Sequence, residues 1–174
     1  IVTMHGPLLT SLAGEIEISR RHLVELATGR TPRVEIFGPQ AETVRAGTAE
    51  GPLIGGNLSI ISALMGTGHL PDLGGAILFM EDVNEQPYRI DRMLTQLKLA
   101  GVLGAVAGIV VGDLDGDVGT LRALVAERTA GLFCPVVFNF PVGHGKMNMA
   151  LPQGVRARLD AGARSLAILE ACVE

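Results

Sequence analysis

A continuous apolar run that ends on two carboxylates constrains the fold of this chain more than any other feature. The residues from Ala76 to Met80 are all apolar, and Glu81 and Asp82 follow at once. The run does not alternate between polar and apolar residues, so both faces of the predicted strand should be covered by other parts of the chain. Carboxylates are costly to place at the end of a buried strand without partners. The end of this strand is therefore the first place to look for chemistry.

Strand-like and helix-like stretches alternate along the rest of the chain. The further strands expected from apolar residues lie at 34–37, 43–49, 105–111 and 135–140, with a closing hairpin over 155–160 and 165–173. Apolar residues at helical spacing predict four helices. The first begins at Ser19, and the second is capped by Asn57 and ended by Gly66. The other two cover 88–100 and 118–130. Strands that alternate with helices and end in a β tail predict an α/β fold.

Composition excludes several classes of protein. Hydrophobic residues make up 48% of the chain and charged residues 18%, so we expect a folded core rather than disorder. The net charge is −4, and no stripe of Lys and Arg alternates with aromatic residues, so nothing favours a nucleic-acid partner. No apolar run approaches the roughly 20 residues of a membrane span. We therefore expect neither a nucleic-acid nor a membrane partner.

The cysteines and the first residues bear on the cellular compartment. Cys134 and Cys172 are too few for a disulfide framework, and residues 1–9 have neither the basic leader nor the apolar core of a signal peptide. We expect a cytoplasmic protein. The chain begins with Ile1 rather than Met, and its opening is typical of the middle of a domain, so we expect the natural protein to begin upstream.

A domain boundary is predicted near residues 30–40. The composition changes there, and the stretch from Thr31 to Ala41 is typical of a linker that contains a short strand. We assign residues 1–35 to the end of one domain and the start of the linker. Residues 36–174 then form a second domain.

Two groups of residues are candidates for catalysis. Glu81 and Asp82 stand where a strand ends, the usual position of a site in α/β folds. His144 follows another predicted strand and lies between Gly143 and Gly145, which allow a close approach by a substrate or another segment. A histidine held by a carboxylate is the general-base arrangement of a hydrolytic triad. The residues alone leave the alternative open that these side chains only face water.

Metal sites and cofactor motifs are not predicted. The stretch from Asp113 to Asp117 is similar to the start of a calcium loop, but Val118 and Leu124 stand where such a loop needs Gly and Glu. His69 and Asp72 lack a third ligand at a suitable spacing. We expect no metal and no cofactor.

No serine stands in the turn between strand and helix that exposes a nucleophile. The serines predicted at helical, capping or surface positions are Ser11, Ser19, Ser59, Ser62 and Ser165.

Four blocks of residues occur in a specific order over nearly the whole chain. They are His5-Gly-Pro7, Gly55-Gly-Asn-Leu-Ser59 with Gly66-Thr67, Ile77-Leu-Phe-Met-Glu-Asp-Val-Asn-Glu85 running into Tyr88-Arg-Ile-Asp-Arg-Met-Leu94, and Pro141-Val-Gly-His144. In order and spacing they resemble the LD-carboxypeptidase family of serine peptidases. That family comprises the muramoyltetrapeptide carboxypeptidases, with the microcin self-immunity hydrolases as a branch.

The resemblance implies a Ser-His-Glu triad that releases a terminal D-amino acid, D-alanine, from the L,D-linked murein tetrapeptide in peptidoglycan recycling. By position, Glu81 matches the glutamate of the triad and His144 the histidine, with Glu85 as the rival carboxylate in the same block. We predict that Asn57 and Gly143 bind the substrate. The implied fold is a C-terminal swivelling β/β/α-type domain, preceded by the tail of a flavodoxin-like N-terminal domain.

The chain departs from the family pattern in one main respect. The family's nucleophile sits in a Gly-x-Ser-Asp elbow upstream of the His-Gly-Pro block, and this elbow does not occur in the sequence. We therefore expect the N-terminal half of the same protein as a partner, and no activity of this chain alone. We also expect a homodimer. A smaller departure is Gly68-His69 where the family often has Pro-Tyr. The alternatives are a microcin self-immunity-type hydrolase and a non-catalytic binding domain with the same fold.

Overall fold

The computed structural model describes residues 1–10, 12–29 and 33–172. Residues 11, 30–32, 173 and 174 lie outside the described residues, and with them Ser11, the start of the predicted linker at Thr31 and the end of the last predicted strand at Val173.

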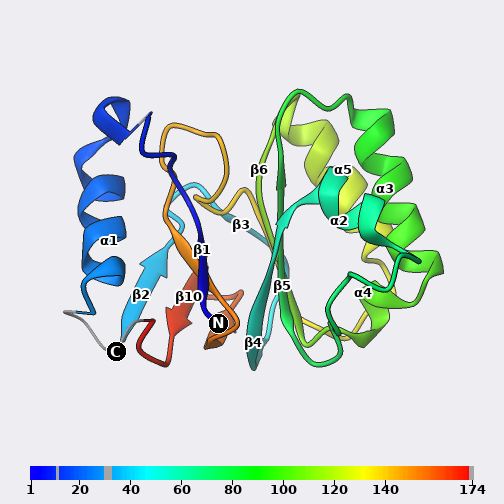
Figure 1. The fold of residues 1–174 in the computed structure, drawn as a ribbon. Helices are drawn as coiled ribbons and strands as arrows, with labels where there is room; N and C mark the ends of the chain where they lie inside the picture. Colours follow the sequence, from blue (N-terminus) through cyan, green and yellow to red (C-terminus); the bar gives the residue numbers. More distant parts are fainter. Residues whose placement is uncertain (11, 30–32, 173–174) are drawn as a thin grey trace.

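Within the described residues, one mixed sheet runs through the middle of the molecule (Figure 1). Its strand order is β2-β10-β9-β4-β5-β6-β7-β3. The strands of its parallel part are β4 (Thr48–Asn57), β5 (Ile77–Asp82), β6 (Gly108–Leu114) and β7 (Val136–Phe138). The strands added antiparallel at its two sides are β9 (Arg156–Asp160), β10 (Ser165–Ile168) and β2 (Val34–Phe37) beside β4, and β3 (Glu42–Arg45) beside β7. The α/β fold is confirmed.

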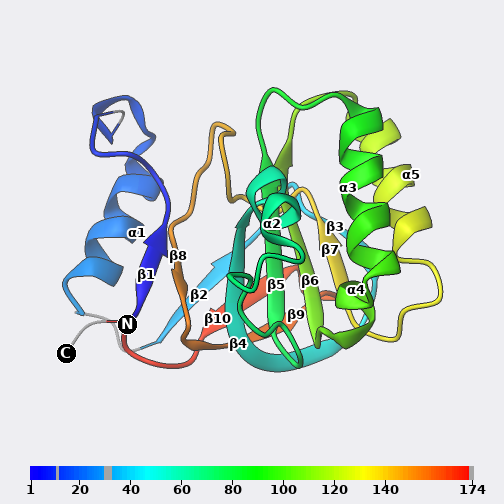
Figure 2. The same cartoon turned by 45° about the vertical axis from the view of Figure 1, so that its right-hand side comes forward.

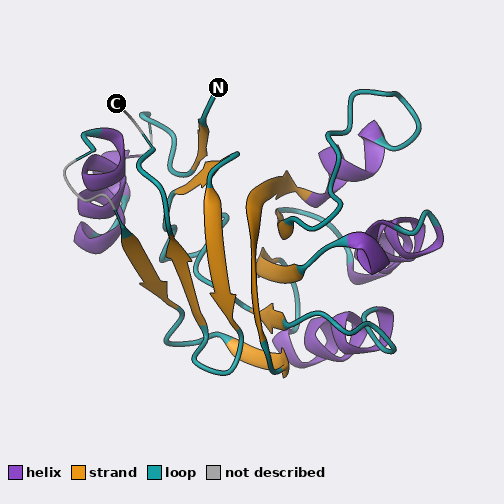
Figure 3. Cartoon of the chain, turned by 90° about the horizontal axis from the view of Figure 1, so that it is seen from below, coloured by secondary structure: helices purple, strands orange, loops and turns teal. Residues whose placement is uncertain are grey.

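Helices cover one face of the parallel strands (Figures 1 and 3). They are α2 (Leu58–Leu64), α3 (Pro87–Leu99), α4 (Val102–Ala105) and α5 (Val118–Arg128). On the opposite side of the molecule lie the 3₁₀ turn η1 (Leu12–Gly14), α1 (Glu17–Ala27) and a small ribbon formed by β1 (Thr3–His5) and β8 (Leu151–Gln153) (Figure 2). No described helix combines the length and the apolar character that crossing a bilayer needs.

Strand β5 separates two hydrophobic cores. Leu78 and Met80 face the core under the helices, whereas Ile77 and Phe79 face a second core between the parallel strands and the antiparallel strands. All four side chains are at most 1% exposed, and burying each one stabilises the fold by roughly 1.5–3 kcal/mol. The apolar run therefore does not alternate because the sheet is covered on both faces, as predicted.

The bounds of several predicted elements were wrong. The strand expected at 43–49 is two strands, and β4 continues to Asn57 through a stretch rich in Gly and Pro. A Cβ on Gly55 would collide with the carbonyl oxygen of Phe79 in β5, so this glycine lets neighbouring strands approach. Helix α1 begins two residues before Ser19, which is buried and accepts a hydrogen bond from the Asn148 backbone N–H at 3.1 Å.

The predicted boundary at 35/36 falls inside β2, which pairs with β10. The division of the chain into domains stays a prediction.

Candidate active site

The carboxyl end of the parallel strands brings the candidate residues together. Glu81 is at the end of β5, and the loop that follows β7 carries His144. Parallel strands present their carboxyl ends at one edge of a sheet, where α/β proteins place their sites. The ribbon of β1 and β8 brings His5 to the same place, because β1 ends on His5 and its imidazole lies 3.7 Å from the Glu81 carboxylate.

Glu81 and His144 form a hydrogen-bonded pair. The distance between His144 Nδ1 and Glu81 Oε2 is 2.8 Å, so the ring N–H donates to the carboxylate. The Glu81 side chain is fully buried, whereas that of His144 is 53% exposed. In the described part of the chain, the other ring nitrogen, Nε2, makes no hydrogen bond. Nδ1 of the imidazole is therefore held by a buried carboxylate, and Nε2 is available to a reacting group.

Gly143 makes the approach of the histidine loop to Glu81 possible. Its φ of +118° lies in a region that side chains with a Cβ rarely adopt. A Cβ at this position would stand 2.9 Å from Glu81 Cβ and 3.0 Å from Glu81 Oε2. Its backbone N–H points to Asn148 Oδ1 at 3.4 Å. The predicted role of Gly143 in substrate binding stays a prediction, but its conformation positions His144.

Asp82 has a different environment from its neighbour. Its carboxylate accepts hydrogen bonds from Asn57 Nδ2, the Ser59 backbone N–H, the Ser59 hydroxyl and the Val83 backbone N–H, at 2.7–2.9 Å. Asn57 also caps α2 by accepting a hydrogen bond from the Ile60 N–H at 3.1 Å. The polar groups of Asn57 are thus engaged in holding the start of α2, and its role in substrate binding stays a prediction.

The rival carboxylate, Glu85, lies elsewhere. It forms an ion pair with Arg89, one helical turn further on, at 3.4 Å. The described contacts bring Glu81 and not Glu85 to His144. The geometry agrees with the choice of Glu81, while the catalytic role of the pair stays a prediction.

His5 is the second histidine at Glu81. Its Nε2 lies 3.7 Å from Glu81 Oε1, on the oxygen that His144 does not use. Its ring packs edge-on against Phe79, with 5.3 Å between the ring centroids. Burial lowers the pKa of His5, while the nearby Glu81 charge opposes and His144 adds to the lowering. Sequence reasoning quoted the His5-Gly-Pro7 block but assigned no role to His5.

Asp113 is a third carboxylate at this edge; the sequence analysis considered it only as the start of a calcium-like loop and did not place it at this site. Burial raises its pKa, and the charges of Asp115 and Glu81 raise it further, while His144 lowers it. A Cβ on Gly145 would lie 3.3 Å from Asp113 Cγ. The signal was available, because Asp113 stands near the end of β6 just as Glu81 stands near the end of β5.

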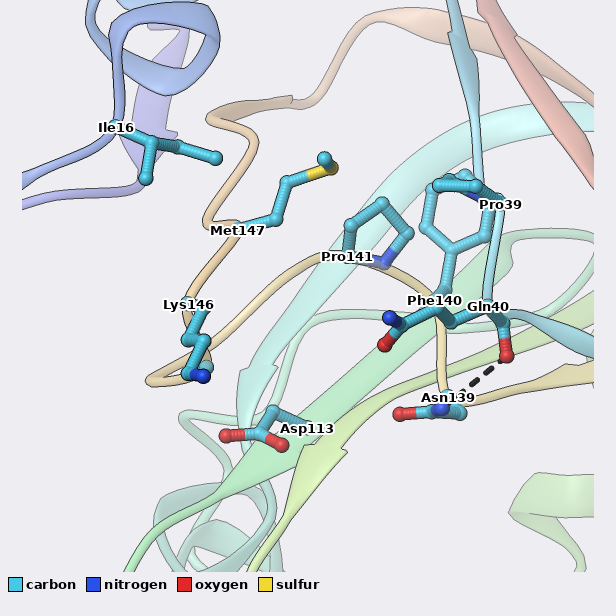
Figure 4. Close-up of a pocket in the computed structure, with 10 residues that line it drawn as sticks. Ile16, Pro39, Gln40, Asp113, Asn139, Phe140, Pro141, Lys146 and Met147 are labelled. Atoms are coloured by element: carbon cyan, nitrogen blue, oxygen red, sulfur yellow. Dashed lines mark hydrogen bonds between the residues drawn. The ribbon is translucent and has the colours of Figure 1, made fainter.

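A pocket of about 410 Å³ opens next to the loop that carries His144, although neither Glu81 nor His144 lines it (Figure 4). The loop after His144 contributes Gly145, Lys146 and Met147, and the end of β6 contributes Asp113. In the view, Ile16, from the start of α1, and Met147 lie on one side of the pocket, and Phe140 and Pro39 lie on the other (Figure 4). The pocket is thus largely apolar with one carboxylate and one ammonium, a surface that suits a peptide with charged groups.

The weaker candidates do not assemble into a site. His69 lies in an exposed turn, and the Asp72 carboxylate accepts a hydrogen bond from the Gly74 N–H at 2.9 Å. In the described ranges no group of three or more His, Cys, Asp or Glu side chains could hold a metal ion. No serine hydroxyl of those ranges hydrogen-bonds to His144.

Comparison with known proteins identifies the family. Residues 50–159 match the LD-carboxypeptidase C-terminal domain family. This chain belongs to that family. The matched range includes both Glu81 and His144, so the family assignment covers the hydrogen-bonded pair.

Individual relatives agree with the family. A Bacillus subtilis protein named "Probable murein peptide carboxypeptidase" is 34% identical over 187 residues, which cover 99% of this chain and 57% of that protein. The Microcin C7 self-immunity protein of Escherichia coli is 31% identical over 131 residues, 72% of this chain and 38% of that protein. The chain thus spans little more than half the length of the curated relatives that it matches.

A solved structure has the same fold. The crystal structure of muramoyltetrapeptide carboxypeptidase from Oxalobacter formigenes superposes with a TM-score of 0.81 at 31% identity, covering 96% of this chain and 60% of that chain. The mixed sheet, its helices and the N-terminal ribbon are therefore parts of the family fold.

Proposed function

We propose that this chain supplies the acid–base half of a serine carboxypeptidase, with Glu81 and His144 as two members of a Ser-His-Glu triad. The observation that carries the proposal is the 2.8 Å hydrogen bond between buried Glu81 Oε2 and His144 Nδ1. It places a negative charge behind one ring nitrogen and leaves the other nitrogen exposed, as a general base requires. The nucleophilic serine would come from the N-terminal half of the same protein.

The reaction then follows from the position of the imidazole. His144 Nε2 takes the proton of the serine hydroxyl while the serine oxygen bonds to the carbonyl carbon of the terminal L,D peptide bond. When the C–N bond breaks, His144 returns this proton to the nitrogen of the leaving D-amino acid. Water then releases the acyl group by the same proton movements. Glu81 fixes the tautomer and stabilises the imidazolium in both halves of the reaction.

The proposed substrate is the murein tetrapeptide, from which D-alanine leaves. The names of the relatives support this class, since the Bacillus subtilis relative is named for murein peptides and the Oxalobacter formigenes structure for muramoyltetrapeptide. The pocket beside His144 supports a peptide substrate by its size and by its mixture of apolar wall and charged groups.

Exposed apolar side chains near the start of the chain, one of which lines the pocket, support a partner segment there. Leu9 is 85% exposed, and Ile16 and Ile18 are each about two-fifths exposed. Apolar groups gathered along one stretch mark a contact surface. We propose that the N-terminal half of the protein packs there and brings its serine to His144.

The proposal is tested by substitution of His144 in the full-length protein. His144→Ala should lower kcat for D-alanine release from the murein tetrapeptide by about 10,000-fold or more, because the general base is lost. His69→Ala, at an exposed position without a described contact to the hydrogen-bonded pair, is the matched control and should keep full activity. Turnover retained by His144→Ala would show that the domain binds rather than catalyses.

A second candidate function is the microcin self-immunity type, favoured by the Escherichia coli relative. It differs in the substrate, a peptide-nucleotide, and shares the His144–Glu81 chemistry. Assaying the full-length protein with both substrates separates the two. Cleavage of the peptide-nucleotide without D-alanine release from the tetrapeptide would favour this second function.

A further inference from the structure

The buried oxygen Oε1 of Glu81 lacks a hydrogen-bond partner among the described residues. The whole side chain is shielded from water, and its other oxygen is engaged by His144. A carboxylate oxygen that is buried without a donor costs on the order of 1–3 kcal/mol, more when charged. Such an atom therefore needs an explanation in a native structure.

His5 is the ionisable group that faces this oxygen. Its Nε2 lies 3.7 Å from Oε1, and its side chain is 22% exposed. A movement of about 0.5 Å would bring the two atoms within the usual hydrogen-bond range of about 2.7–3.2 Å. Catalytic hydrogen bonds are often long in a structure without substrate and shorten in the reacting complex. His5 and His144 thus flank the carboxylate, one at each oxygen.

The chain holds His5 in this place from three sides. β1 pairs with β8, and His5 lies opposite Leu151 in that ribbon. The next residue, Gly6, passes so close to Ala150 that a Cβ would stand 2.8 Å from Ala150 Cβ. The imidazole packs edge-on against Phe79. A ring confined in this way can orient the Glu81 carboxylate, whose described polar neighbours are His5 and His144.

We propose that His5 is a positioning residue: as a neutral N–H donor it holds Glu81 Oε1, and so keeps Oε2 aligned with His144. This inference rests on the proposed function. His5 takes no proton from the substrate or the serine. It acts through Glu81, by restricting rotation of the carboxylate while His144 gains and loses its positive charge.

The charge state of His5 agrees with this role. The titratable groups that act on it are Glu81, from β5, and His144, from the loop after β7. Burial has the largest effect and lowers the pKa of His5, so the ring stays neutral at neutral pH. A protonated His5 would compete with His144 for the same carboxylate and would repel the imidazolium that forms there. Neutral His5 donates without this competition.

Two substitutions in the full-length protein test the proposal. His5→Phe keeps a ring against Phe79 and removes the donor, so kcat for D-alanine release should fall by about 10- to 100-fold with KM unchanged. His5→Gln restores a neutral N–H donor of similar reach and should recover most of the lost kcat. A kcat of His5→Phe equal to wild type overturns the proposal, and so does an equal loss in both variants at unchanged Tm.

His22→Gln is the matched control. His22 is also a buried histidine, and its Nε2 lies 2.8 Å from the carbonyl oxygen of Ala150, the residue against which Gly6 packs. The substitution of His22 therefore changes packing near Gly6 and Ala150 without changing a residue that contacts Glu81. It should lower Tm while kcat stays within about twofold. A loss of kcat as large as that of His5→Phe would assign the effect to packing and overturn the proposal.

A spectroscopic measurement keeps the inference separate from the proposed function. The proton between His144 Nδ1 and Glu81 gives a downfield ring N–H signal in NMR of the full-length protein labelled at histidine nitrogens. His5→Phe should shift or broaden this signal, and His5→Gln should restore it. An unchanged signal in His5→Phe overturns the proposal even if no D-alanine release is found. Lack of release by the wild type overturns the proposed function alone.

Discussion

Glu81 and Asp82 are neighbours in the sequence, both buried, and yet they occupy opposite kinds of site. Asp82 is 2% exposed and accepts four hydrogen bonds, three of them from residues at the start of α2. Glu81 is 0% exposed and has a single short hydrogen bond, to His144. A fully satisfied carboxylate is held in one place, whereas a partly satisfied one stays responsive to the charge of its partner. The difference separates a structural anchor from a candidate catalytic group.

The strand itself creates this difference. Successive side chains of a strand point to opposite faces of the sheet, so two adjacent carboxylates cannot share one environment. Asp82 points toward the start of α2, and Glu81 points toward β1 and the loop that carries His144. Two adjacent residues at the end of β5 can therefore serve as a structural anchor and as a candidate catalytic group.

The largest expected effect breaks the Glu81 side of the comparison. Glu81→Gln keeps the shape and removes the charge, so kcat for D-alanine release by the full-length protein should fall by about 10,000-fold. The free energy of unfolding should change little, since a buried charge with an unsatisfied oxygen contributes little net stability. Paired activity and urea-unfolding measurements check this. If Glu81→Gln strongly lowered the free energy of unfolding, Glu81 would be a structural anchor like Asp82.

The next effect breaks the Asp82 side. Asp82→Ala removes the acceptor of four hydrogen bonds and should lower the free energy of unfolding by about 2–4 kcal/mol. The folded fraction should keep its kcat. Asp91→Ala is the control, since the Asp91–Arg128 ion pair is partly exposed and its loss should lower the free energy of unfolding much less than Asp82→Ala does. Equal losses in the two variants would contradict the anchoring role.

A smaller effect sharpens the comparison at Asn57. Asn57→Ala removes the cap of α2 and one donor to Asp82, which should cost about 1 kcal/mol of unfolding free energy. Asn57→Ser keeps a capping oxygen and should recover part of that loss. If Asn57 also binds substrate, as predicted, both variants should raise KM for the tetrapeptide. An unchanged KM would mean that Asn57 holds Asp82 and the start of α2 but does not bind substrate.

The smallest effect concerns the histidines and the pH. Burial lowers the pKa of His22 and of His5 below the ordinary value near 6.5. The unfolded chain then binds more protons than the folded one, so stability should be lost as pH falls from about 6.5 through the folded pKa values. His22→Gln should flatten this loss, as measured by urea unfolding between pH 7 and pH 5. A slope unchanged by the substitution would contradict the assignment to His22.

Much of the fold was predictable because the signals were local. The non-alternating runs at 76–80 and 105–111 predicted buried strands, and β5 and β6 confirm them within a few residues. β4 was partly missed, because Gly51, Pro52, Gly55 and Gly56 are typical of a turn. Close packing between neighbouring strands favours glycine there, and that requirement does not show in a single segment.

The candidate site was less predictable from the residues themselves. The spacing of Glu81 and His144, 63 residues apart, left open whether they meet, and only the resemblance to a family joined them. His5 and Asp113 could be placed beside Glu81 and His144 only when their neighbours were known. Their chemistry comes from burial and from nearby charges, which are properties of the folded chain.

The sequence by itself determined the class of fold, the buried strand that ends on Glu81 and Asp82, and, through its four blocks, the family. Period and hydrophobicity are carried by each segment, so they can be read without knowing the neighbours. The tertiary structure decided which carboxylate is an anchor and which faces His144, and it brought His5 to the remaining oxygen of Glu81. Those outcomes depend on distances between segments far apart in the chain, and only the packed sheet sets them.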